Sequence, residues 1–431
     1  LIGRPARPFS PQRAFLVLIS TGEKNAVAAK WGWSAEGRWV WKWKDWIDQR
    51  FMRKFNELPE MAAEAATLLD PGLADPATLS DISAVAMRCG GCGAKVGANV
   101  LTRALADLEP AANEDILIGL HAPDDAAVVQ VPNGKVMVHT VDYFRAFIDD
   151  AYVFGQVAAN HALSDIFAMG AEAQSALAIA TVPYGLEAKV ETSIREMMAG
   201  ALEVLNEAGA TLVGGHTSEG PELALGFSVN GLADRETILR KGGMAVGDIL
   251  ILTKPLGTGT LFAADMQQKA KGRWIEGALK SMVQSNRQAA QCLFDHGASA
   301  CTDITGFGLL GHMVEMTKAS DVDVEIDFDS LPVLDGAQET VRLGILSSLQ
   351  PANVRLRRAI RNLNEAREHE RYPLIFDPQT SGGLLASLPA ERVQSCLRVL
   401  RDLGYANATI VGRVAAKSDY LEPVTLISRP N

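Results

Sequence analysis

The sequence predicts two subdomains built of α/β or α+β units, preceded by a small separate N-terminal segment. Strand-sized and helix-sized apolar patterns alternate from about residue 88 onward, which is typical of such domains. A turn-rich joint at residues 242–248 interrupts the alternation. Residues 1–60 differ in composition, because six of the seven Trp lie between Trp31 and Trp46. With 431 residues, the chain is long enough for roughly two or three domains.

The N-terminal segment carries a run of alternating aromatic and polar residues, WGWSAEGRWVWKWKDW, at residues 31–46. This pattern fits a short hairpin or an amphipathic surface piece. Two uses remain open: the Trp side chains pack against the protein, or together with the neighbouring Lys they lie on a membrane surface. Residues 61–87 are rich in Ala and contain Pro71 and Pro76, so we expect a linker there.

Individual elements follow from the periodicity of apolar residues. Residues 151–169 have the length and spacing of a helix, and Gly170 follows as a stop. Residues 187–208 give a second helical pattern that ends at Gly209. We expect one domain over residues 88–241 and a second over residues 242–431. Strands are predicted at residues 135–141, 175–182, 223–232 and 249–253.

Charge and composition exclude several classes of function. The formal net charge is −10 and no basic stripe is visible, which argues against nucleic acid as a partner. No apolar run of about 18 residues occurs, so no membrane span is expected. Five cysteines are few and odd in number, which favours a reducing cytoplasm over a disulfide scaffold. The chain starts at Leu1 without a signal-peptide pattern, so we interpret it as a piece of a longer protein.

Three segments place an Asp where a carboxylate is costly unless it is paired or holds a metal. Asp124 and Asp125 open a predicted strand, Asp165 lies in a mostly apolar helix, and Asp303 precedes a Gly-rich approach to a helix. Mg²⁺ prefers a few carboxylate oxygens and leaves other positions to water and phosphate. Asp125, Asp165 and Asp303 are suitable ligands if the fold brings them together. Taken singly, each is also compatible with a helix cap or a turn.

Candidate phosphate-binding groups are less specific. Residues 213–217, VGGHT, follow a predicted strand, and small residues there let backbone N–H groups approach an anion. Asp142 lies at the end of the strand at residues 135–141, where sheets often place ligand sites. Residues 377–383, DPQTSGG, are interpreted as a rigid turn that enters a strand.

Cys89 and Cys92 form a C-x-x-C pair in the Gly-rich stretch CGGCGAK. A redox disulfide lacks the expected strand-then-helix context, and a zinc site would need two further ligands. The third interpretation is a reactive thiol on a Gly-rich loop with Lys95 beside it. Lys95 would lower the pKa of the thiol and supply a positive charge for phosphate. An incidental surface Cys remains the alternative.

Taken together, these motifs resemble the selenide, water dikinases, also called selenophosphate synthetases, from about Arg88 to the C-terminus. The resemblance covers roughly four fifths of the chain, and the motifs occur in the family's order. They are CGAK at 92–95, DDAAV at 124–128, TVDYF at 140–144, ALSDIFAMG at 162–170, GGH at 214–216, LTKPLG at 252–257, TDITGFGLLGH at 302–312 and DPQTSGG at 377–383.

The resemblance implies roles for particular residues and a two-subdomain fold like that of aminoimidazole ribonucleotide synthetase (PurM-like). In that fold the N-terminal half is α/β and dimerises, and the C-terminal half is α+β. Cys92 matches the catalytic Cys and Lys95 the essential Lys, which also contacts nucleotide. Asp125, Asp165 and Asp303 match magnesium ligands. The implied nucleotide-site residues are Ala122, Pro123, Asp124, Asp142, Asp165, Gly215, His216 and Thr217.

The implied activity is the synthesis of selenophosphate from selenide, ATP and water, with AMP and phosphate released. Mg²⁺ is the implied cofactor. The implied partners are ATP, selenide, a second copy of the chain and a selenium-delivery protein. This chain departs from the family's frequent C-x-C-K at Ala94, so a vicinal Cys pair is not general to the mechanism. Cys89 has no counterpart in the family's motif. His161 stands at a helix position where other members can carry Asn, and we interpret His161 as a packed helix residue.

Residues 1 to about 60 resemble the C-terminal end of an NADH dehydrogenase-like flavoprotein. The resemblance rests on PQRAFL at 11–16, ISTG at 19–22 and KDWID at 44–48. The G-x-G-x-x-G fingerprint of dinucleotide binding is absent from this sequence segment, so we expect no FAD on it.

Three functions other than selenophosphate synthesis are also compatible with the sequence. The first is another ATP enzyme of the same superfamily, acting on a thiamine phosphate, a purine precursor or a carbamoyl group for hydrogenase maturation; the loop from Cys92 to Lys95 argues against it. The second is a redox protein built on the N-terminal segment and the Cys89–Cys92 pair, which would need bound flavin. The third is a partner-binding protein without catalysis.

Overall fold

The computed structural model describes residues 16–30, 32–56, 98–120 and 127–428. The chain divides into two compact units, Leu1–Ala86 and Met87–Asn431. No helix in the described part of the chain has both the length and the apolar character to cross a bilayer.

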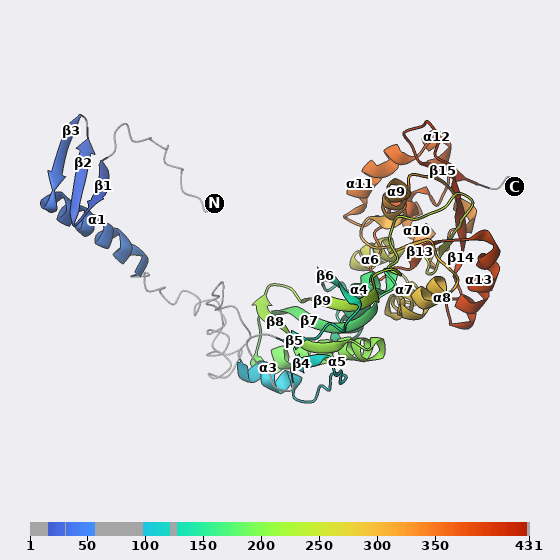
Figure 1. Cartoon of the computed structure of the whole chain (residues 1–431), viewed down its shortest axis with the longest axis horizontal. Coiled ribbons are helices and arrows are strands. Elements are labelled where there is room, and N and C mark those ends of the chain that lie inside the picture. Colours follow the sequence, from blue (N-terminus) through green and yellow to red (C-terminus); the bar gives the residue numbers. More distant parts are fainter. Residues whose placement is uncertain (1–15, 31, 57–97, 121–126, 429–431) are drawn as a thin grey trace. The chain divides into compact units, whose positions relative to one another are not determined.

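The first unit is a small antiparallel sheet followed by a helix (Figure 1). The strands are β1 (Val17–Gly22), β2 (Asn25–Lys30) and β3 (Trp33–Gly37), and α1 spans Arg38–Asn56. Ala26, Ala28 and Val40 form its core. The Trp-rich run is therefore half strand and half helix. Trp41 packs against the core, whereas Trp33 is 85% exposed, so the packing interpretation holds for only part of the run.

The second unit begins with a four-stranded sheet in the order β6-β9-β7-β8. The neighbours β7 and β8 are parallel, and the other neighbours are antiparallel. Helices α4 and α5 pack against each other and against this sheet, and α3 packs on α5. The elements are α3 (Ala98–Leu105), β4 (Ile116–Ile118), β5 (Val128–Val129), β6 (Lys135–Arg145), α4 (Ala151–Ala168), β7 (Glu172–Pro183), α5 (Glu187–Ala208), β8 (Thr211–Gly220) and β9 (Ala224–Asp234).

Two glycines let α4 and α5 approach closely. A Cβ on Gly155 would lie 2.0 Å from the carbonyl oxygen of Met197, and one on Gly200 would lie 2.0 Å from that of Tyr152. Real side chains do not tolerate such distances, so only glycine permits this backbone contact. Helix α4 starts at Asp150, whose side chain accepts a hydrogen bond from the Val153 N–H.

The second half contains a six-stranded sheet in the order β11-β13-β10-β14-β12-β15. Only β12 and β15 pair in parallel among these strands. The strands are β10 (Ile249–Leu252), β11 (Ala300–Asp303), β12 (Asp323–Asp327), β13 (Leu384–Leu388), β14 (Thr409–Ala415) and β15 (Val424–Ile427). The α-helices are α6 (Thr258–Met266), α7 (Gly272–Val283), α8 (Arg287–Asp295), α9 (Gly308–Ser320), α10 (Ala337–Arg342), α11 (Gln350–Asn353), α12 (Leu363–Ala366) and α13 (Val393–Asp402).

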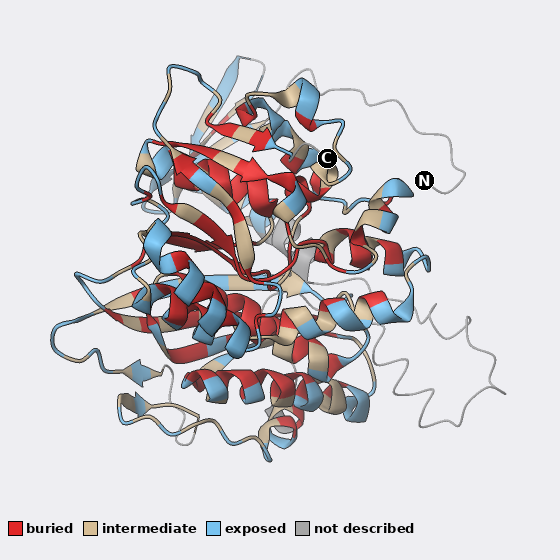
Figure 2. Ribbon diagram, turned by 90° about the vertical axis from the view of Figure 1, so that its right-hand side faces the viewer, coloured by how far each residue is buried: buried red, intermediate tan, exposed pale blue. Residues whose placement is uncertain are grey.

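The two halves share a continuous apolar core. One cluster of buried residues includes Phe154 and Leu163 of α4 together with Leu384 of β13 and Leu397 of α13. Helix α4 contacts β11, α7 and α8 as well as its own sheet. Helix α4 is buried along most of its length, as are strands β9, β10, β11 and β13, whereas β6 is mostly exposed or half-buried (Figure 2). Side chains on α4 therefore reach both halves.

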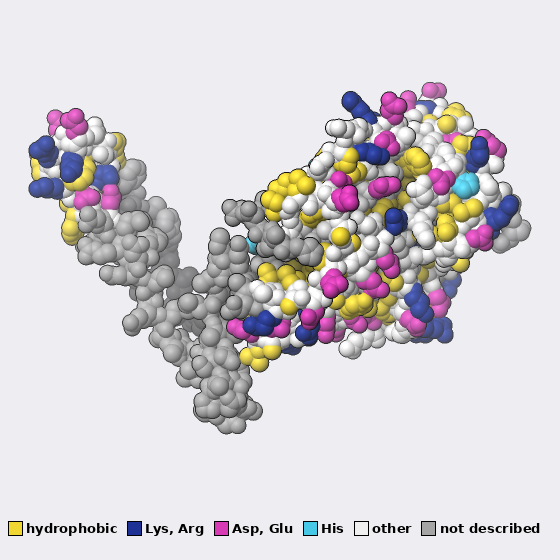
Figure 3. Space-filling view, turned by 60° about the horizontal axis from the view of Figure 1, so that its bottom comes forward, with side chains coloured by type: hydrophobic (Ala, Val, Ile, Leu, Met, Phe, Trp, Pro, Cys, Tyr) yellow, Lys and Arg dark blue, Asp and Glu magenta, His cyan; other side chains and the backbone are white. Residues whose placement is uncertain are grey.

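Most predicted elements are confirmed. The predicted helices at 151–169 and 187–208 are α4 and α5, and Gly209 ends α5 in the left-handed region at φ 79°. The predicted strands correspond to β6, β7, β9 and β10. The face of the second unit in Figure 3 mixes acidic and basic side chains, in keeping with the absence of a basic stripe in the sequence.

Candidate active site

Three carboxylates from three separate elements converge in the second unit. Asp142 lies on β6, Asp165 on α4 and Asp303 at the end of β11. The Thr140 hydroxyl donates to Asp165 Oδ2 at 2.6 Å, which ties the helix to β6. Asp303 is 4% exposed. These positions are 161 residues apart at the extremes, so only the tertiary fold brings them together.

The electrostatics of the three acids reflect that closeness. Burial raises the pKa of Asp142 to about 7, and the neighbouring charge of Asp165 adds to the effect. Burial also raises the pKa of Asp303 to about 7, with further contributions from the charges of Asp165 and Asp142. Like charges in a desolvated place disfavour ionisation unless cations offset them. The arrangement therefore favours binding of positive charge.

The donor set fits a hard divalent cation. Asp303 Oδ2 is buried and has no hydrogen-bond partner within the described structure. Carboxylate oxygens are what Mg²⁺ prefers, with water and phosphate oxygens in the remaining positions. Among the described residues, the three acids do not form a group whose ligand atoms all lie within 4.8 Å of one another.

A buried lysine lies near the acids. Lys254 is 1% exposed, and its Nζ donates to the carbonyl oxygens of Gln284 at 2.5 Å and Ser381 at 3.2 Å. Burial lowers the pKa of Lys254 to about 7, while the charge of Asp303 acts in the opposite direction. In the sequence, Lys254 was noted only as part of the LTKPLG motif, and no role was predicted for it. Its position directly after an apolar strand is the signal that could have singled it out.

Hydrogen bonds also join the two halves next to the acids. His161 Nδ1 accepts the Ser381 N–H at 3.0 Å, and its Nε2 lies 3.8 Å from Asp142 Oδ1. Burial lowers the pKa of His161 to about 4, which keeps it neutral. Asn286 Nδ2 donates to the Ser164 hydroxyl and to the Gly382 carbonyl oxygen, both at 2.8 Å. The sequence reasoning assigned no role to Asn286.

The approach from Asp303 to α9 is also held in place. The Thr305 N–H donates to His312 Nε2 at 3.1 Å. Phe307 is the N-cap of α9, and no side chain caps that helix end. Asp303 is therefore not a helix cap, and the turn-or-cap alternative is wrong for this residue. The DPQTSGG turn enters strand β13, as expected.

The prediction that residues 213–217 follow a strand is wrong, because they lie within one. Gly214, Gly215, His216 and Thr217 lie inside β8 and pair with β7. A Cβ on Gly215 would lie 2.2 Å from the Ala178 carbonyl oxygen, so this glycine serves close strand pairing. A Gly-Gly pair in the sequence does not reveal such a contact.

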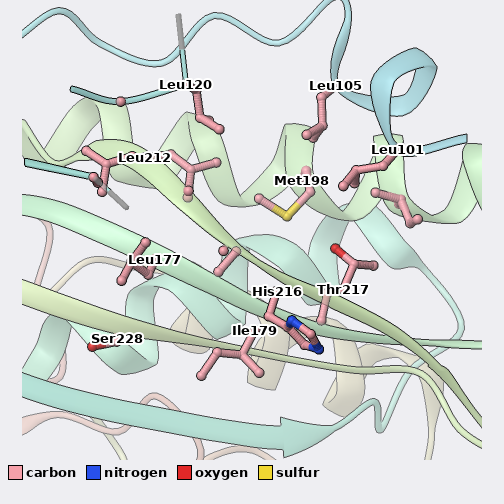
Figure 4. Close-up of a pocket in the computed structure, with 18 of the residues that line it drawn as sticks. Leu101, Leu105, Leu120, Leu177, Ile179, Met198, Leu212, His216, Thr217 and Ser228 are labelled. Atoms are coloured by element: carbon pink, nitrogen blue, oxygen red, sulfur yellow. The ribbon is translucent and has the colours of Figure 1, made fainter. Parts of the chain in front are cut away.

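The same β8 residues line a cavity of about 590 Å³. Leu101 and Leu105 of α3 and Met198 of α5 form another part of its wall, and His216 and Thr217 lie next to each other on β8 (Figure 4). Strands β6 and β8 are the two edges of their sheet. Three strand spacings of about 4.8 Å make a separation of roughly 14 Å between these edges. Gly215, His216 and Thr217 are thus set apart from Asp142.

A second cavity, of about 310 Å³, borders the acids directly. Thr140, Asp165 and Asp303 line one part of it, and Arg240 and Lys241 contribute basic side chains. The remaining predicted site residues lie outside the described residues: Cys92, Lys95, Ala122, Pro123, Asp124 and Asp125, together with Cys89.

Comparison with known families first defines the class of protein. Residues 123–233 match AIR synthase related protein, N-terminal domain, and residues 245–421 match AIR synthase related protein, C-terminal domain. The solved structure of thiamine-monophosphate kinase from Stenotrophomonas maltophilia superposes with a TM-score of 0.55 at 20% identity, covering 76% of this chain and 94% of that chain. The hydrogenase maturation protein HypE from Escherichia coli gives a TM-score of 0.55 at 18% identity, with 76% and 91% covered. The chain has the AIR synthase-related fold.

Curated relatives then identify the family within that class. A selenide, water dikinase from Caldanaerobacter subterraneus subsp. tengcongensis is 40% identical over 330 residues, which covers 77% of this chain and 94% of the relative. One from Pelobacter propionicus is 38% identical over 324 residues, covering 75% and 92%. The chain belongs to the selenide, water dikinase family. The flavoprotein resemblance of residues 1–60 is not addressed by these matches and stays a prediction.

Proposed function

We propose that this chain makes selenophosphate from selenide, ATP and water, releasing AMP and phosphate. The observation that carries the proposal is the convergence of Asp142, Asp165 and Asp303 in a chain 40% identical to a selenide, water dikinase. Phosphoryl transfer depends mainly on positioning and on neutralising phosphate charge. A set of one buried and two half-buried acids suits that task once metal and nucleotide bind.

Asp165 and Asp303, with Asp125, are the proposed magnesium ligands, and Asp142 is the neighbouring carboxylate of the nucleotide site. Mg²⁺ would supply charge neutralisation on the phosphate oxygens. The orphaned Oδ2 of Asp303 supports its part in this set. Thr140 orients Asp165 through its hydroxyl.

Cys92 and Lys95 are the proposed catalytic residues. Lys95 would contact a phosphate, and Cys92 would hold or guide the soft selenium nucleophile. Closure of the Gly-rich loop at residues 90–93 over ATP would exclude water from the reacting groups. These roles rest on the sequence resemblance.

The nucleotide also needs a surface for its less polar part. We infer that Gly215, His216 and Thr217 contribute through the cavity along β8 rather than through a backbone anion site. Its volume of about 590 Å³ lies within the range of about 300–1,000 Å³ that small-molecule sites occupy. Ala122, Pro123 and Asp124 are proposed to contact the nucleotide as well, and Ala127, which lines this cavity, supports their placement.

A homodimer is the proposed assembly. In each chain, residues 88–241 and 242–431 are the two proposed catalytic domains, and residues 61–87 are a linker to the N-terminal segment. Support comes from the sheet face opposite α4. Val141, Tyr143 and Leu177 are 60%, 46% and 39% exposed there. An apolar sheet face of this kind marks an interaction surface.

Phosphorus NMR of the full chain with ATP and Mg²⁺, with and without selenide, tests the activity. Selenophosphate and AMP should appear only with selenide. Cys92→Ser should lose selenide-dependent AMP formation yet still bind ATP, while Cys89→Ser should keep the reaction. An unchanged rate in Cys92→Ser removes Cys92 from the mechanism. Phosphate transfer without selenide dependence indicates another ATP enzyme of the AIR synthase-related class.

A further inference from the structure

Two cysteines and a histidine meet in the second half of the chain. Cys292 lies on α8, His296 immediately follows that helix, and Cys396 lies on α13. One ligand atom from each lies within 4.8 Å of the others, and no other such group of three occurs among the described residues. The two Sγ atoms are 3.8 Å apart, and Cys292 Sγ is 3.7 Å from His296 Nδ1.

These separations match those between ligands on a tetrahedral zinc ion. With Zn–S bonds of about 2.3 Å, two sulfurs on a tetrahedron lie about 3.8 Å apart. With a Zn–N bond of about 2.0–2.1 Å, a sulfur and a nitrogen lie about 3.5 Å apart. Both values are close to the observed 3.8 and 3.7 Å. The ligand atoms of the third pair, Cys396 and His296, also lie within 4.8 Å of each other, so the three groups are close enough to share one ion after a small movement.

The sequence spacing and burial fit the same interpretation. Cys292 and His296 are four residues apart, which places them on one side of a helix and its end. Cys292 is 4% exposed and Cys396 fully buried, whereas His296 is only half-buried and provides access for an ion. His296 Nδ1 donates to the Cys292 carbonyl oxygen at 2.7 Å, so a metal on Nδ1 would replace that proton.

The pair is not a disulfide in this structure. A bonded pair would have its sulfurs at about 2.05 Å, well short of the 3.8 Å observed. Two buried thiols can also be ordinary core residues. A third, imidazole ligand at tetrahedral distance, reachable from solvent, distinguishes this cluster from a core pair.

We propose that Cys292, His296 and Cys396 form a zinc-binding site, with the fourth position open to water. Two thiolates neutralise the charge of one Zn²⁺, so the ion can lie in this mostly buried place. The site would clamp α8 to α13. Because Asn286, directly before α8, bonds to Ser164 beside Asp165, the clamp also steadies one wall of the active site.

The experiment measures zinc bound to the full chain after chelation, reduction and dialysis against Zn²⁺. Wild type should retain one equivalent that is lost in His296→Ala and in Cys396→Ala. Cys301→Ala, which removes another buried thiol, should retain it, as should the Cys89→Ser/Cys92→Ser double variant. Since His296 lies half-exposed at a helix end, His296→Ala should fold, and circular dichroism checks this.

Cobalt provides the spectroscopic signature of the ligands. Co²⁺ in the wild type should give sulfur-to-metal charge-transfer absorption and the intense visible bands of tetrahedral geometry, both absent in Cys396→Ala. Zn²⁺ should raise the melting temperature of the wild type but not of His296→Ala. Zinc retained by His296→Ala and Cys396→Ala, or lost only in the Cys89→Ser/Cys92→Ser variant, overturns the proposal. So does a Cys292–Cys396 disulfide found by mass spectrometry in place of metal.

Discussion

Two buried acids of the second half, Asp303 and Asp377, differ in what surrounds them. Burial raises the pKa of each to about 7. Asp377 Oδ2 accepts the Gly259 N–H at 3.1 Å and Gln379 Nε2 at 2.9 Å, so it anchors the start of α6. Asp303 instead faces the charges of Asp165 and Asp142.

The difference shows which property marks a binding site. Burial and a raised pKa occur at both acids, and each has one oxygen without a hydrogen-bond partner within the described structure. What separates them is the convergence of like charges at Asp303 and the backbone donors at Asp377. An acid stabilised by the chain's own N–H groups supports structure, whereas acids that repel one another need an external cation.

The largest expected effect comes from removing a charge at the site. Asp303→Asn should lower selenophosphate formation by about a hundredfold or more. Mutation of a group that only supports a metal ligand already lowers metal affinity or activity by about 10–100-fold, and loss of a ligand should cost more. The free energy of unfolding without metal should stay the same or rise, since a like-charge repulsion is relieved. Phosphorus NMR and urea unfolding give the two values.

Asp377→Asn is the matched control for that variant. It should leave selenophosphate formation within a few-fold of wild type. Equal loss of activity in both variants would break the distinction between a binding acid and a structural acid.

A smaller effect is expected from the amide that joins the two halves. Asn286→Ala removes the hydrogen bonds to Ser164 and Gly382, and should cost about 1–3 kcal/mol of unfolding free energy. Asn362→Ala removes two comparable bonds to the Leu426 backbone and should cost a similar amount. Only Asn286→Ala should also lower kcat. If both or neither lower kcat, the bond to Ser164 does not position Asp165.

The last prediction concerns pH. Burial raises the pKa of Asp377 from its ordinary value of 3.8 to about 7, so Asp377 keeps its proton to a higher pH in the fold than in the unfolded chain. Its contribution to stability is therefore fully present below about pH 4 and is lost as the pH rises through about 7. The slope in that window is up to about 1.4 kcal/mol per pH unit.

Asp377→Asn, which cannot ionise, should flatten that part of the stability profile measured by urea unfolding at several pH values. An unchanged profile would show that Asp377 does not titrate in this range.

The sequence predicted the parts of the molecule that depend on local pattern. Helices α4 and α5 follow from their apolar spacing, and Asp165 and Asp303 stood out because carboxylates are unusual in apolar surroundings. Asn286 could not be found in this way, since its partner Ser164 is 122 residues away. Cys292 and Cys396 are 104 residues apart and look like isolated core cysteines in the sequence. The position of Gly215 inside a strand was not predicted, because its role is close pairing with a neighbouring strand.

The metal-binding role of Asp303 is tested most directly by the binding of Mn²⁺, a paramagnetic substitute for Mg²⁺, in the presence of a non-hydrolysable ATP analogue. Electron paramagnetic resonance counts the bound ions in the wild type, Asp303→Asn and Asp377→Asn. If Asp303 is a metal ligand, Asp303→Asn loses at least one ion or binds it at least tenfold more weakly, while Asp377→Asn matches the wild type. The same number of ions with the same affinity in Asp303→Asn would show that Asp303 does not bind metal.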